Sequence, residues 1–257
     1  MPNKQIDDER ERQVLIEWSG LTNEVQLLCV DLNDRTSSWQ GMSTDPAAFS
    51  LILFKRAYGH VRAFSLLYNE KLYLDADACG RNAVEVAICL ANLAARPGGF
   101  IADLRSDAAS TAKGQMPNWG LDDPEFADQA TGDLTRIFGD RRSDGSRHQK
   151  LNMSALADGA GLSHLYRWYR HFSGMRVHVT GLSILSNIVA VGDDDHETSV
   201  DAFRRLSRIH GLAAVGGASA ISCEAHARLH RVDELRDRAA ELMRRMSALG
   251  PTEIFGP

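Results

Sequence analysis

Two pairs of polar residues could carry chemistry, each set in an apolar or aromatic stretch. Arg81 and Glu85 are four residues apart in the apolar segment 72–95, so a helix there would carry both on one side. Ser173 and His178 are five apart, at the end of an aromatic segment. Because an unpaired charge in a protein interior is strongly unfavourable, we expect the ion pair to be buried and the serine and histidine to hydrogen-bond to it.

This polar cluster has two interpretations. In the first it is a structural network that fixes the register of two buried helices. In the second it is a phosphate or nucleotide site, where Arg81 holds an anion and His178 acts as general acid or base, because the unperturbed pKa of histidine is near neutrality. The candidate catalytic residues are Arg81, Glu85, Ser173 and His178.

A second arginine–histidine pair lies further along the chain. Arg205 and His210 are separated by four residues on an expected helix, a spacing that resembles the signature of the RNA-cleaving toxins of the HEPN-type helical superfamily. In such an enzyme histidine handles the proton of the ribose hydroxyl and arginine stabilises the charged phosphate, without a metal. The alternative is a solvated helix face. The candidate ligand-binding residues are Tyr166, Arg170, Arg205 and His210.

The segments 74–104 and 150–178 resemble an uncharacterised bacterial family, known only as a domain of unknown function. The shared features are Arg-x3-Glu in an apolar helix and then Ser-x4-His after a Tyr-rich helix. The resemblance spans roughly residues 70–180. It implies an all-α fold and no established activity.

Other motifs favour structural roles. His226 and His230 are four apart, a spacing that can hold a metal, but neither HExxH nor a second carboxylate–histidine motif accompanies them. We therefore expect an exposed helix face, with no metal and no other cofactor. The acidic run GDDDHE lacks the glycine and terminal glutamate of a calcium loop and is typical of a capping loop. The sequence contains no P-loop, GxGxxG or GxSxG motif.

The segment 72–95 must position the first polar pair. It is apolar nearly all round, which is typical of a helix buried in the middle of a domain. We expect other helices at 6–34, 46–69, 100–113, 124–138, 151–161, 162–192 (one or two), 199–230 and 232–249. The segment 139–150 has no apolar residue, and we expect a flexible loop there between two helical halves of a single all-α domain, 1–257.

Composition narrows the class of protein. The chain has 257 residues and a net charge of −5, which argues against a generally basic nucleic-acid binder. Its four cysteines lack CxxC spacing, so we expect buried thiols in a reducing compartment. Residues 1–13 are highly polar, and no apolar stretch reaches about 18 residues, so we expect no signal peptide, no membrane span and a cytoplasmic protein.

Periodic stripes suggest self-association. The first and last helices have apolar residues in alternating steps of four and three, and the run 209–223 has small residues four apart. We expect these surfaces to form a homodimer interface. The sequence thus predicts a multi-helix bundle around 72–95 that acts as a non-catalytic interaction or ligand-binding module. The alternative is a metal-independent RNA-cleaving nuclease of the toxin or defence type, with RNA or a nucleotide as partner.

Overall fold

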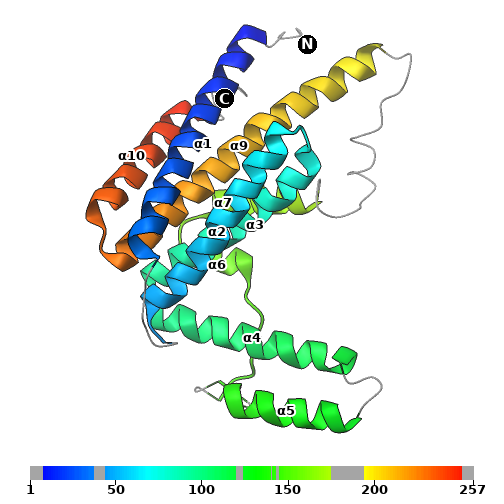
Figure 1. Ribbon diagram of the computed structural model, residues 1–257. Coiled ribbons are helices and arrows are strands. Elements are labelled where there is room, and N and C mark those ends of the chain that lie inside the picture. The colour runs from blue at the N-terminus through cyan, green and yellow to red at the C-terminus, as the bar shows by residue number, and fades with distance from the viewer. Residues whose placement is uncertain are drawn as a thin grey trace.

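The computed structural model describes residues 8–37, 44–119, 124–139, 141–142, 145–174 and 194–250. Every regular element in these ranges is a helix, so the all-α prediction is confirmed (Figure 1). The helices are α1 (Asp8–Thr36), α2 (Pro46–Asn69), α3 (Tyr73–Ala95), α4 (Pro97–Trp119), α5 (Pro124–Phe138), α6 (Met153–Gly159), α7 (Ser163–Phe172), α9 (Asp194–His230) and α10 (Asp233–Leu249). None of those helices, over the ranges described, has both the length and the hydropathy that crossing a membrane requires.

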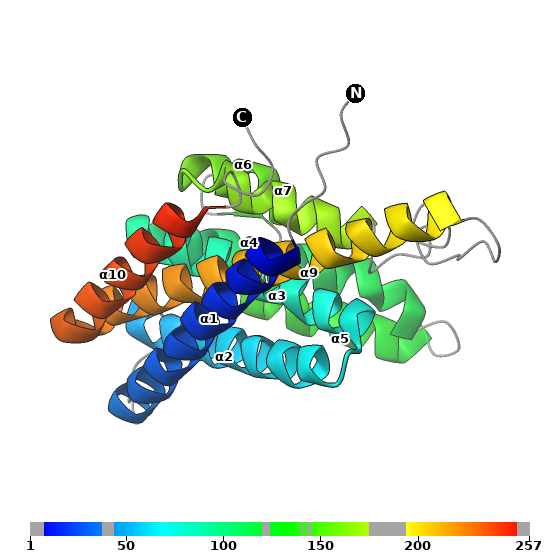
Figure 2. The same ribbon diagram turned by 90° about the horizontal axis from the view of Figure 1, so that it is seen from above.

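Two helices form the centre of the bundle. In α3 every residue from Ala83 to Leu90 except Glu85 is buried, as its apolar sequence predicts. The bundle around a buried central helix is therefore confirmed. The long helix α9 shares this central place, because it contacts α1, α2, α3, α7 and α10, and it crosses the middle of the molecule in Figure 2.

The core has two parts that meet at α3 and α9. The first part joins these two helices to α1, α2 and α10, with Phe54 and Phe64 fully buried in it. The second part joins them to α4, α6 and α7, with Phe100 and Phe172 buried. Helices from both sides of the segment 139–150 contribute to each part.

The apolar stripes of α1 and α10 are covered within the chain. Buried residues of the two stripes are Trp18, Leu21, Val25, Leu28, Leu32, Leu235, Ala239, Leu242 and Met246. The small-residue run of α9 is also largely buried, against the same two helices and α3. The expectation that these surfaces form a homodimer interface is therefore wrong, because each stripe already has its partner in the same chain.

Local sequence signals predict the start of one helix correctly and the start of another incorrectly. Asp45 caps α2 by accepting a hydrogen bond from Ala47 N at 2.8 Å, as predicted. The Pro-Gly-Gly sequence after Arg96 was expected to separate two helices by several residues. Instead Pro97 is the first residue of α4, where its missing N–H needs no partner, and Phe100 N donates to Arg96 O at 2.9 Å.

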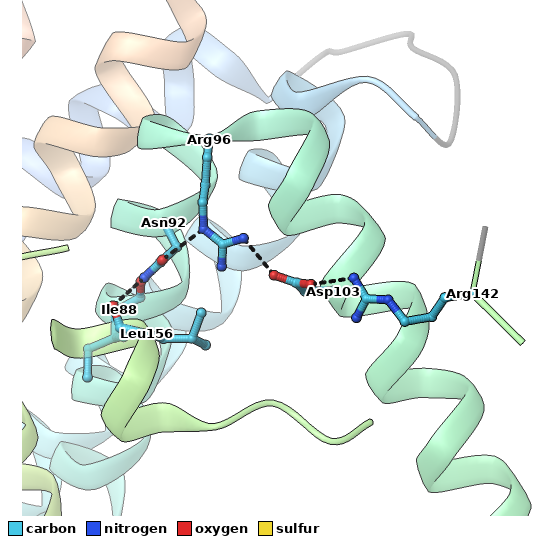
Figure 3. A network of polar contacts seen from close by, with 6 residues as sticks. All are labelled: Ile88, Asn92, Arg96, Asp103, Arg142 and Leu156. Carbon is cyan, nitrogen blue, oxygen red and sulfur yellow. Dashed lines mark hydrogen bonds and ion pairs between the residues drawn. The ribbon is translucent and has the colours of Figure 1, made fainter. Parts of the chain in front are cut away.

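Near the end of α3, a buried asparagine contacts α6, and an arginine next to it contacts α4 (Figure 3). Asn92 Nδ2 donates to Leu156 O at 2.9 Å and to a carbonyl of its own helix. Beside it, Arg96 donates to Asp103 Oδ2 at 2.7 Å, and Arg142 donates to Asp103 Oδ1 at 3.0 Å. Arg142 belongs to the segment expected to be a flexible loop, and through this bond the segment contacts α4.

Candidate functional site

The short helix α7 supplies side chains to two sites. Leu165 and Phe172, seven residues apart, are buried and fix the rotation of the helix. With that rotation, Tyr169 and Ser173, which follows the end of the helix, lie on the face of α7 that is turned toward α3. The side chains on the side of α9 are His164, Trp168 and His171.

The first site, the Arg81 cluster, consists of Arg81, Asn82, Glu85, Tyr169 and Ser173. Arg81 Nε donates to Ser173 Oγ at 2.8 Å, and Arg81 Nη2 donates to the Tyr169 hydroxyl at 2.5 Å. Nη1 donates to Asn82 Oδ1 at 3.2 Å. The guanidinium also lies over the Tyr169 ring, 4.5 Å from its centroid. One arginine thus joins α3 to α7 through two hydrogen bonds and a ring contact.

The ion pair of this cluster lies at the edge of the bundle. Glu85 Oε2 is 3.7 Å from Arg81 Nη2, and the two side chains are 39% and 22% exposed. The expectation of a buried pair is wrong in this respect, and an ion pair so open to water contributes little to stability. Burial and then the Glu85 charge raise the pKa of Tyr169, while Arg81 opposes them, so the phenol is protonated at neutral pH.

The structure brings together three of the four candidate catalytic residues, Arg81, Glu85 and Ser173. His178 lies outside the described residues. Sequence reasoning missed Tyr169, although it precedes Ser173 by four residues and so shares its side of the helix. The chemical role of this set stays a prediction.

The candidate ligand-binding residues are scattered over the molecule. Tyr166 stacks on Tyr169, with ring centroids 5.8 Å apart, and the Arg170 side chain is exposed. The backbone of Arg205 belongs to α9, but its side chain lies outside the described part of the structure. His210 is on the opposite side of α7 from the Arg81 cluster, against Trp168.

The second site is a pocket of about 790 Å³ between α7 and the α1–α10 pair, with α9 along its base. We call it the Gly217 pocket. The side chains and backbone that give it its chemistry are those of Trp18, His164, Trp168, His171, His210 and Gly217. Most of its surface is apolar, and its polar groups come mainly from α7 and α9.

Adjacent glycines of α9 have opposite surroundings. A methyl group at Gly216 would lie 3.1 Å from Met246 Cε and 3.2 Å from Thr22 Oγ1, so this glycine allows α1 and α10 to approach α9 closely. A methyl group at Gly217 would meet no atom within 4 Å. The bare backbone of Gly217 therefore faces the pocket.

The pKa values of two pocket histidines are lowered, so both are neutral at pH 7. Burial, with a smaller effect of the neighbouring His171, lowers the pKa of His210 to about 4. Burial and the Arg167 charge also lower the pKa of His164. The His210 and Trp168 rings lie 4.6 Å apart, centroid to centroid, so an apolar face and a proton-binding group are adjacent.

The α1 wall of the pocket contains Trp18, which is only 3% exposed. Its indole Nε1 has no hydrogen-bond acceptor among the described residues. A buried donor without an acceptor is unfavourable by about 1–3 kcal/mol.

The histidine pair of α9 that resembled a metal motif is structural. His226 is fully buried, with Nδ1 2.7 Å from Ser50 Oγ and Nε2 2.9 Å from Thr36 Oγ1. The expectation of an exposed helix face is therefore wrong for His226, and both ring nitrogens are occupied by hydroxyl groups. Within the described ranges, no three His, Cys, Asp or Glu side chains are placed to hold a metal ion.

Comparison with known proteins shows a family to which the chain is similar. The profile of a family of unknown function (DUF5677) matches residues 47–197, more than half of the chain. The chain belongs to this family. The resemblance to an uncharacterised all-helical family is thereby confirmed. No curated protein and no solved structure matches the chain significantly.

The family match covers all of the first site and only part of the second. The segment that matches DUF5677 contains the whole Arg81 cluster and the α7 wall of the Gly217 pocket. Trp18, His210 and Gly217 lie outside the matched residues. The pocket is thus built from the family segment together with α1, α9 and α10.

Proposed function

We propose that this protein is a small-molecule-binding helical module and that its ligand occupies the Gly217 pocket. The observation that carries the proposal is the bare backbone of Gly217 facing a space of about 790 Å³. Ligand pockets typically measure roughly 300–1,000 Å³ and combine an apolar lining with a few convergent polar groups. The pocket has this composition, whereas Arg81 directs its donors to residues of its own chain.

The lining favours a flat, largely apolar molecule. Trp168 offers an aromatic face for stacking, and Met243 and Met246 on α10 offer flexible apolar surface. At Gly217 a ring can approach the helix backbone because no Cβ stands in the way. We therefore propose a ligand with one or more aromatic rings.

The test is a fluorescence titration with N-phenyl-1-naphthylamine, an uncharged aromatic probe. We expect the wild-type protein to bind it and a Gly217→Leu variant to bind it at least about tenfold more weakly, because leucine fills the base of the pocket. Leucine is also the better helix former, so the variant keeps its fold. Gly59→Leu is the matched control, because Gly59 is an exposed glycine of α2, and a methyl group added there would also meet no atom within 4 Å.

Equal probe affinity in wild type and Gly217→Leu would refute the pocket as the binding site. Absence of probe binding by a folded wild-type protein would refute the proposed function itself. Circular dichroism of each variant provides the check that the fold is intact.

The RNA-cleaving alternative has one specific observation in its favour. His171 and His210 both pack against Trp168, with ring centroids at 5.7 and 4.6 Å, and Arg167 lines the same pocket. Two histidines and an arginine are the groups that metal-independent RNA cleavage requires. On this second proposal His171→Ala and His210→Ala each abolish RNA cleavage and leave the protein folded. Retained cleavage in both variants, or none in the wild type, would contradict it.

We further propose a cytoplasmic location and self-association of the chain. The spacing of the four cysteines supports the location, because none is in a CxxC pair and a reducing compartment keeps such thiols free. Sedimentation equilibrium tests the self-association, and a monomer at micromolar concentration would contradict it.

A further inference from the structure

The polar side chains around the Gly217 pocket can all donate hydrogen bonds. They are His164, Arg167, His171, His210 and Ser247. In the part of the chain that the structure describes, no Asp or Glu side chain lines this space. Such a lining complements a ligand that carries negative charge and hydrogen-bond acceptors.

The stacking surface is next to these donors. Trp168 follows His164 by four residues and precedes His171 by three, so all three side chains share one side of α7. The His171 and His210 rings each contact the Trp168 ring. A ring placed on Trp168 therefore holds its own substituents within reach of the histidines.

We infer that the Gly217 pocket binds an aromatic anion, with the ring system against Trp168 and Gly217 and the acidic group between Arg167 and the pocket histidines. The acidic group is a carboxylate, sulfonate or phosphate, which share charge and acceptor geometry. This inference rests on the proposed binding function and adds the charge of the ligand to it.

His210 has basic residues as neighbours on one side and both basic and acidic residues on the other. The groups on α7 that line the pocket with it are His164, Arg167 and His171. From α1 and α10 the pocket receives the uncharged Trp18, Met243, Met246 and Ser247. Toward α3, the Arg208 guanidinium lies over the Tyr73 ring, 4.4 Å from its centroid. Asp77 is also close, because its Oδ1 atom would be 3.3 Å from a methyl group added at Gly211.

An anion in this position couples binding to proton uptake. Without ligand, burial and His171 keep the pKa of His210 near 4, so the imidazole is neutral at pH 7. A negative charge beside the ring stabilises the imidazolium, so the pKa rises in the complex. The complex then holds more protons than the free protein, and affinity increases as the pH falls, by at most about tenfold per pH unit for each coupled histidine.

The experiment compares two probes that differ by one acidic group. 8-Anilinonaphthalene-1-sulfonate has the same ring system as N-phenyl-1-naphthylamine and carries a sulfonate. We expect the sulfonate probe to bind about tenfold more tightly than the uncharged probe at pH 6, because one charge-assisted hydrogen bond contributes about that much affinity. We expect its affinity to fall several-fold between pH 6 and pH 8, while the affinity of the uncharged probe stays constant.

Three variants separate the pocket from other cationic surfaces. Gly217→Leu measures sulfonate binding elsewhere on the protein, and this contribution is subtracted. Arg167→Gln weakens binding of the sulfonate probe at both pH values by a larger factor than it weakens binding of the uncharged probe. His210→Asn removes most of the pH dependence of sulfonate binding, because asparagine does not titrate.

The outcomes distinguish this inference from the function on which it rests. If both probes bind with equal affinity and Gly217→Leu blocks both, the pocket is a ligand site and the inferred charge is wrong. If neither probe binds to the folded wild type, the proposed function fails and the inference fails with it. A sulfonate preference that survives both Arg167→Gln and His210→Asn also overturns the inference.

Discussion

Acidification should destabilise this protein through one buried histidine. His226 of α9 is fully buried between α1 and α2, where it contacts the hydroxyls of Thr36 and Ser50 and stacks on Phe54 at 4.1 Å. Burial, with a smaller effect of His230, lowers the pKa of His226 to about 3. The perturbation is a change from about pH 7.5 to about pH 5.

The sign and size of the effect follow from proton linkage. The unfolded chain takes up a proton at His226 as the pH falls through its ordinary value of 6.5, whereas the folded chain does so only near 3. The contribution of His226 to stability is thus fully present above 6.5 and is lost as the pH falls from 6.5 toward 3. At pH 5 the loss of stability is about 2 kcal/mol. Its size is set almost wholly by the pKa of His226 in the unfolded chain.

Urea unfolding at the two pH values measures this loss. Other histidines with lowered pKa values, such as His60 and His230, change the free energy of unfolding in the same direction. Subtracting the pH dependence of a His226→Gln variant isolates the contribution of His226, because glutamine does not titrate. We expect the wild type to lose about 2 kcal/mol more than the variant. Equal losses in the two proteins would refute the reasoning.

Three further predictions concern stability, each measured by urea unfolding. Asn92→Ala should lower the free energy of unfolding by about 1–3 kcal/mol, because it removes the two buried hydrogen bonds that Asn92 donates to the Ile88 and Leu156 carbonyls; a loss below the error would contradict this. Gly217→Ala should raise stability by about 0.5–1 kcal/mol, and Gly216→Ala should be the less stable of the two because it crowds α1 and α10; the reverse order would contradict the packing described. Lys71→Gly should raise stability by about 1 kcal/mol, because Lys71 has a φ of 62°, and a loss would contradict that backbone conformation.

Much of the fold could be predicted because its signals are local. The segment 72–95 is long, apolar and free of proline, so burial of α3 follows from its composition alone. Asp45 and Pro46 mark the start of α2 in the same local way. The partner of each stripe could not be predicted. An apolar face shows that something covers it, but the pattern is the same whether the cover is another helix of the chain or a second copy.

The two sites differ in the same way, because one follows from local sequence signals and the other depends on how the helices pack. Helical spacing placed Arg81 and Glu85 on one side of α3, and the family resemblance related them to Ser173. The Gly217 pocket was missed because Gly216 and Gly217 are identical in sequence terms. They point about 100° apart on the helix, and only the packing of α1 and α10 decides which one is covered.

A crystal structure of the complex with 8-anilinonaphthalene-1-sulfonate tests the central claim most directly. We expect the naphthalene ring to lie against Trp168 and the backbone of Gly217, with the sulfonate near Arg167, His171 or His210. A probe bound elsewhere on the protein, or a complex in which side chains close the space above Gly217, would contradict it.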